Sequence, residues 1–155
     1  MSEAKFDLLL EELSELFQTP LERDVKNACR IVVDEKLVIQ MELDEPKEHL
    51  MLGSVICTIP AGKFRENVLK EALKENNQPP PLHGVLSYVE KNNTLVLYEY
   101  HLISELKAAQ LAEFLEAMME KALVWYEAID KGQPSPNPSE VVVDKPPPPQ
   151  YGVRL

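Results

Sequence analysis

Apolar residues recur at three- and four-residue steps between residues 102 and 132, and this spacing predicts one long helix. Ser104 is the expected N-cap, because its hydroxyl can accept a hydrogen bond from an unpaired N–H of the first turn. Gly132 is the expected C-terminal stop. Such a helix would be roughly 40 Å long, so its apolar face is expected either to lie wholly in the core or to serve a partner in part. That face comprises Leu111, Phe114, Leu115, Met118, Ala122, Trp125 and Ile129.

Two shorter stretches repeat the helical pattern. The first, residues 3–18, ends at Thr19, because a residue before proline avoids the helical region. This helix is expected either to dock on the core alone or, because Leu8 widens its apolar face, to offer a groove as well. The second, residues 63–75, ends at the proline-rich run 76–81. The apolar face of the first helix comprises Phe6, Leu9, Leu10, Leu13, Leu16 and Phe17, and that of the second Phe64, Val68, Leu69, Ala72 and Leu73.

Short apolar or alternating segments predict five strands. Residues 28–34, 37–43 and 50–58 are expected to form an antiparallel meander, with Gly53 as the site of a bulge. Residues 84–90 and 94–100 predict a hairpin, because the two asparagines between them tolerate the left-handed conformation of a tight turn. The resulting order, α-β-β-β-α-β-β-α, predicts an α+β domain over residues 1–132, in which helices cover a twisted antiparallel sheet.

The composition changes after Gly132. Seven prolines lie between Pro134 and Pro149, four of them consecutive. Because proline lacks an N–H and has a fixed φ, residues 133–155 are expected to form a flexible tail, extended or disordered. Residues 141–143, three valines, could add briefly to a sheet edge.

Charge limits the kinds of partner. The 155 residues suit one domain and carry a net charge of −10. This acidity argues against nucleic acid and against anionic membranes, and it favours basic or easily aggregating protein partners. The acid-interrupted N-terminus predicts no signal peptide, and no apolar run approaches the ~20 residues of a membrane span. Cys29 and Cys57 lie in apolar segments and are expected to be buried thiols of a cytosolic protein.

Residues that carry chemistry form no recognisable site. His49, His83 and His101 stand at predicted loops or strand ends, and none has metal-ligand spacing. Ser54 and Ser87 stand in strands without a nucleophile elbow, and no glycine-rich phosphate loop is present. We therefore expect no catalytic residues, no cofactor and no metal, whereas a small enzyme would need a pocket with convergent polar groups. The pattern favours binding of other protein chains.

With this order of elements, the chain resembles the class I type III secretion chaperones, the Tir chaperone (CesT/SycE-like) family, over roughly residues 3–135. The ending of the last helix, with Trp125, Ile129, Gly132 and Pro134, is especially similar, and the tail is similar to tails of members from obligate intracellular bacteria. The segments that carry the resemblance are FDLLLEELSELF, NACRIVVDEKLVIQMEL, TIPAGKFRENVLKEAL followed by NNQPPP, GVLSYVEKNNTLVLYEY and LISELKAAQLAEFLEAMMEKALVWYEAIDKGQP.

The resemblance implies a cytoplasmic bacterial homodimer without enzymatic activity. Such a dimer would hold the N-terminal segment of secreted effectors extended, soluble and secretion-competent, and would target it to the secretion apparatus, whose ATPase would release it. It would bind no nucleic acid and insert into no membrane. The alternative from the residues alone is an adaptor that acts through its proline-rich tail.

The resemblance also implies two sets of site residues. An obligate dimer would bury on the order of 2,000 Å² or more, and the implied interface residues are Phe64, Val68, Ala72, Leu73, Leu86 and Tyr88. An extended effector segment would lie along the first helix and neighbouring strands. The implied contact residues are Phe6, Leu9, Leu10, Leu13, Val33, Leu37 and Ile39, most of which could equally be core.

Overall fold

The predicted α+β order is confirmed. The structure is a computed structural model, and it describes residues 2–138; the valines at 141–143 and the rest of the predicted tail lie outside the described residues. The elements in chain order are α1 Ser2–Phe17, β1 Ala28–Val33, β2 Leu37–Leu43, β3 His49–Thr58, α2 Lys63–Asn76, β4 Val85–Val89, β5 Thr94–Leu102, the short 3-10 turn η1 Ile103–Glu105, and α3 Ala108–Asp130.

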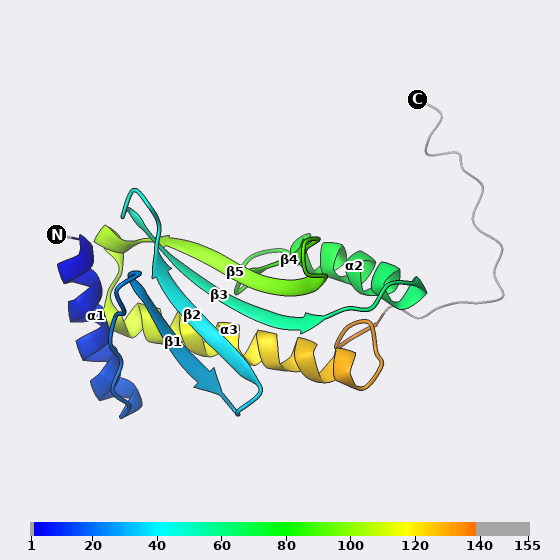
Figure 1. Cartoon of the computed structure of the whole chain (residues 1–155), viewed down its shortest axis with the longest axis horizontal. Helices are drawn as coiled ribbons and strands as arrows, with labels where there is room; N and C mark the ends of the chain where they lie inside the picture. Colours follow the sequence, from blue (N-terminus) through cyan, green and yellow to red (C-terminus); the bar gives the residue numbers. More distant parts are fainter. Residues whose placement is uncertain (1, 139–155) are drawn as a thin grey trace.

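The five strands form one twisted antiparallel sheet in the order β1-β2-β3-β5-β4 (Figure 1). The meander β1-β2-β3 and the hairpin β4-β5 are as predicted from the alternation of apolar residues. The two parts meet at the pairing of β3 with β5, from His49 opposite Leu102 to Thr58 opposite Thr94. The two edges of the sheet are therefore β1 and β4.

The bulge predicted at Gly53 is wrong. Gly53 pairs regularly with Gln40 on β2 and with Tyr98 on β5, and the register shift lies between Val55 and Cys57. A methyl group at Gly53 would lie 3.7 Å from the Leu97 carbonyl oxygen, an ordinary contact. The glycine is therefore not required by backbone geometry, and its presence in a strand gave a false signal.

The core lies between the sheet and the helices α1 and α3. Figure 1 shows α3 running along one face of the sheet, with α1 across one end of that layer. Helix α2 packs instead against the edge strand β4. Core side chains that are at most 1% exposed include Phe6, Leu10 and Leu13 from α1, Ile39, Leu52 and Leu97 from the sheet, and Leu111, Leu115 and Met118 from α3.

The long helix begins later than predicted, and Ser104 is not its N-cap. Strand β5 stays paired with β3 up to Leu102, and the N–H of Ile103 donates to the Glu48 carbonyl oxygen at 3.0 Å. Ser104 therefore lies in η1, and Lys107 takes the N-cap position, with its N–H donating to Gln110 Oε1 at 3.2 Å. The C-terminal stop at Gly132 is confirmed by its positive φ of 83°.

Candidate functional site

Three surfaces are candidates for binding, and the first is the face of the sheet turned away from α3. Side chains alternate along the strands, so the face opposite the core has its own set of residues. This surface, here called the open sheet face, includes Arg30, Val32, Val38, Gln40, Glu42, Met51, Gly53, Val55, Val96, Tyr98 and Tyr100. Val38, Val55 and Tyr100 are 41%, 57% and 54% exposed. A hollow of about 810 Å³ lies over it, lined by Arg30 and Lys36 but by no acidic residue among those described.

The second surface is the free edge of β1. Within residues 2–138, β1 pairs only with β2, and Val32 on it is 66% exposed. Beside this edge lies a cavity of about 580 Å³ between the end of α1, β1 and α3. Its apolar lining includes Phe17, Ile31 and Met119. A strand edge beside an apolar pocket can bind an extended peptide through both its backbone and its side chains.

The residues predicted to bind an effector lie mostly in the core beneath this edge. The four α1 residues of the set are at most 2% exposed, Leu37 and Ile39 are 3% and 0% exposed, and only Val33 is half-buried. The structure thus brings all seven into one apolar layer. The apolar side chains of α1 and β1 that are exposed to solvent are instead Leu8, Leu16 and Val32. Direct effector contact by the predicted seven stays a prediction. Leu16, predicted to share the buried face of α1, is 56% exposed.

The residues predicted to form a dimer interface divide between core and surface. Val68, Ala72 and Leu86 are buried between α2 and β4, Phe64 and Tyr88 are half-buried, and Leu73 is 69% exposed.

Helix α2 is fixed to its own sheet by polar contacts. The Asn76 side chain donates to the Leu86 carbonyl oxygen at 2.8 Å and accepts from the Leu86 N–H at 2.9 Å. Arg65 donates to the Ile59 carbonyl oxygen at 2.6 and 3.0 Å, and its guanidinium lies 5.5 Å from the ring centre of Tyr88. A dimer through α2 stays a prediction.

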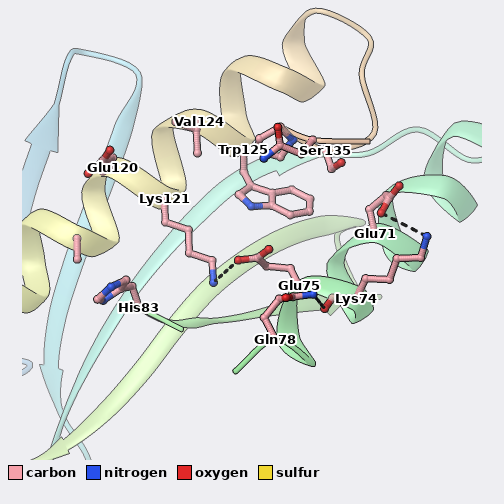
Figure 2. Close-up of a pocket in the computed structure, with 13 residues that line it drawn as sticks. Glu71, Lys74, Glu75, Gln78, His83, Glu120, Lys121, Val124, Trp125 and Ser135 are labelled. Atoms are coloured by element: carbon pink, nitrogen blue, oxygen red, sulfur yellow. Dashed lines mark hydrogen bonds and ion pairs between the residues drawn. The ribbon is translucent and has the colours of Figure 1, made fainter. Parts of the chain in front are cut away.

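The third surface is a pocket between α2 and α3, here called the α2–α3 pocket (Figure 2). Lys121 reaches from α3 toward α2, where its Nζ lies 3.5 Å from Glu75. The same Nζ donates to the carbonyl oxygens of Leu82 and Gly84 at 2.6 and 3.0 Å. Burial lowers the pKa of Lys121, and the negative charge of Glu75 opposes this shift.

Sequence reasoning missed this pocket, although one signal was present. Lys121 stands three residues after Met118 and four before Trp125, so a charged residue lies beside the apolar face of the helix.

Two of the three histidines and both thiols have structural surroundings, whereas His83 is exposed and lines the α2–α3 pocket. His49 Nδ1 lies 3.0 Å from Asp44 Oδ2, and the His101 ring stacks on Phe114 with centroids 4.2 Å apart. Both cysteines are free, and burial raises the pKa of Cys57 to about 11, so its thiol stays protonated at neutral pH. Among residues 2–138, no cluster of three or more His, Cys, Asp or Glu could hold a metal ion.

Across the described part of the chain, no helix is both long and apolar enough to cross a membrane.

The fold is shared with solved structures of type III secretion proteins. A chain in the HopA1–SchA chaperone–effector complex is 22% identical, with a TM-score of 0.66, and the match covers 83% of this chain and 98% of that one. A chain of the ExsC–ExsE complex is 18% identical, with a TM-score of 0.62 and coverage of 80% and 92%. A chain in the crystal structure of the Yersinia pestis type III secretion chaperone SycH in complex with a fragment of YscM2 is 19% identical, with a TM-score of 0.57 and coverage of 76% and 97%. At these identities the likeness establishes the fold.

Comparison with the sequences of curated proteins finds no match. The family assignment comes from a family model, that of the Tir chaperone protein (CesT) family, which matches residues 8–125. This range runs from α1 through the sheet and α2 to Trp125 on α3, so it includes nearly the whole described fold. The chain therefore belongs to the Tir chaperone protein (CesT) family.

Proposed function

We propose that this protein is a non-catalytic, cytoplasmic chaperone that binds the N-terminal segment of type III secreted effectors. The observation that carries the proposal is the family match over residues 8–125. The free edge of β1 beside its apolar cavity supplies a physical means of binding an extended chain. Solved relatives of the same fold include a chaperone–effector complex, that of HopA1 and SchA.

The proposed binding mode is addition of an effector strand to β1. An extended peptide pairs its backbone with the free N–H and C=O groups of an edge strand, and every second side chain points to the same face. Side chains on one face would enter the cavity lined by Phe17, Ile31 and Met119. A segment held this way is covered on its apolar side and cannot collapse into a globule. The net charge of −10 would keep the complex soluble and dispersed.

We further propose that the protein acts as a homodimer through α2 and β4. Leu73 supports this, because a leucine that is 69% exposed on a helix otherwise fixed to its own sheet is available to a second copy. Targeting of the effector to the secretion apparatus and release by its ATPase remain predictions from the family resemblance.

The experiment that tests the function is capture of partners by the tagged full-length protein from native host lysate without ATP, followed by mass spectrometry. The proposal expects one or a few secreted proteins, bound through their N-terminal segments. Recovery of none would overturn it. Recovery of only proline-binding modules would favour the adaptor alternative, in which residues 133–155 are the working part.

A point variant tests the proposed edge. Val32→Asp places a charge at the free edge of β1 beside the cavity, and it should reduce capture of the effector. Val25→Asp is the matched control, because Val25 is 99% exposed and lies in the loop before β1. Equal capture by both variants would place the effector elsewhere on the molecule.

A further inference from the structure

The α2–α3 pocket is separate from the β1 edge and has no role in the function proposed above. It has a volume of about 690 Å³ and lies between α2, α3 and the segment that follows α3. Figure 2 shows Trp125 and Val124 from α3 and Ser135 from the following segment on one side, with Glu75 and Gln78 on the other. The walls therefore combine an apolar part with polar side chains.

One polar group in the pocket has no partner. Ser135 is 4% exposed, and its Oγ makes no hydrogen bond with any described residue. A buried hydroxyl without a partner is unfavourable, so native structures usually provide an acceptor. Ser135 lines the pocket beside the buried indole of Trp125. The pocket thus offers a free donor next to an apolar wall.

The charge at the rim of the pocket is acidic. Glu75 pairs with Lys121 at 3.5 Å and Glu71 with Lys74 at 3.7 Å. Glu120 is exposed and has no ion-pair partner within residues 2–138. A ligand with one positive charge beside an apolar stretch would complement this rim.

The sequence that follows the pocket has this chemistry. Pro136 and Asn137 line the pocket, and residues 139–155 continue from there. They contain Lys145 followed directly by four prolines, Pro146–Pro149. Proline has no N–H, so a polyproline run presents carbonyl acceptors without donors. Its carbonyl groups suit the Ser135 hydroxyl, and Lys145 suits Glu120.

The connection is long enough for the run to return. Six residues, 139–144, separate Pro138 from Lys145, and an extended chain spans ~3.3–3.6 Å per residue. The pocket wall formed by Pro136 and Asn137 is adjacent to the start of this connection. A short tether also raises the effective concentration of the run to the millimolar range, so weak contacts suffice for docking.

We propose that the α2–α3 pocket is the docking site of the segment Lys145–Pro149 of the same chain. The segment covers Val124, accepts a hydrogen bond from Ser135 and pairs Lys145 with Glu120. This inference is independent of effector binding at β1.

Site-specific photo-crosslinking in the full-length protein tests the proposal. A benzophenone amino acid replaces Val124, which is 41% exposed at the pocket, or Val38, which is also 41% exposed but lies on the open sheet face. After irradiation, mass spectrometry of protease fragments should find residues 144–150 linked to position 124 and absent from position 38. Replacement of Pro146–Pro149 by serines should abolish the link, and so should excess synthetic peptide of residues 144–150.

Three results would overturn the proposal. The first is that the benzophenone at position 124 forms no link to residues 144–150. The second is an equal yield from positions 124 and 38, which would mean random contact. The third is a link that joins two copies and grows with protein concentration, because it would place the segment in the pocket of a second chain.

Discussion

At the scale of single residues, Lys121 is the side chain that ties α3 to the loop between α2 and β4. Replacement by methionine keeps the length of the side chain but leaves the carbonyl oxygens of Leu82 and Gly84 without their donor. Unpaired buried acceptors cost about 1–3 kcal/mol, and we expect Lys121→Met to lower the free energy of unfolding by that amount in urea titrations. Lys131→Met is the control, because Lys131 is exposed. Equal stability of the two variants would mean that water replaces the Lys121 contacts.

Asp24 gives a prediction of pH dependence. Its Oδ1 accepts hydrogen bonds from the N–H groups of Ala28 at 3.0 Å and Lys26 at 2.7 Å, and these bonds lower its pKa. A carboxyl whose pKa is lower in the folded state stabilises the fold above its unfolded pKa, and this stabilisation disappears as the pH falls through the folded pKa. Asp24→Ala should therefore lower the urea midpoint at pH 7, and the difference from the native protein should vanish in acid. Glu22→Ala is the control, because Glu22 is an exposed neighbour, and it should leave the urea midpoint unchanged both at pH 7 and in acid.

At the scale of elements, α2 is the helix whose surface the dimer proposal depends on. Leu73→Glu changes an exposed position, so it should leave the thermal midpoint nearly unchanged and convert the dimer to monomer in size-exclusion chromatography with light scattering. Leu8→Glu on α1, where Leu8 is 50% exposed, is the matched control and should remain dimeric. Val68→Glu would not discriminate, since Val68 is 0% exposed and a charge there would destabilise the protomer itself. A dimeric Leu73→Glu protein would contradict the proposed interface.

The elements could be predicted from sequence more accurately than the functions of their residues. Apolar periodicity placed α1, β2 and α2 within about a residue of their observed bounds, because periodicity reports local burial. Alternation with Gln40 and Glu42 assigned Leu37 to the buried face of β2 and Val38 to the other face, as observed. It could not tell whether a residue such as Leu37 serves the core alone or also contacts an effector, because both uses select an apolar side chain. The start of α3 was missed for a different reason. The pairing of Leu102 with His49 extends β5, and this partner is far away in sequence.

At the scale of the whole molecule, the net negative charge opposes the aggregation that the exposed apolar area of the open sheet face would otherwise favour. The chain has a sequence pI of about 4.8, so its net charge falls toward zero as the pH is lowered to that value. We expect turbidity to be greatest near this pH and to fall in Val55→Glu, which charges a position that is 57% exposed on that face. Val25→Glu adds the same charge away from the open sheet face, and its turbidity should fall by less. If the two variants behave alike, net charge alone governs aggregation.

The pairing of β3 with β5 has a consequence for synthesis on the ribosome. Strands β1, β2 and β3 pair with near neighbours in sequence, but β3 can complete its other side only when β5 has emerged, after α2 and β4. Pairings between distant segments close slowly, because loop-closure entropy must be overcome first. The nascent meander therefore exposes two strand edges for the time needed to translate residues 59–102. During this interval the future chaperone itself presents the kind of surface on which general cellular chaperones act.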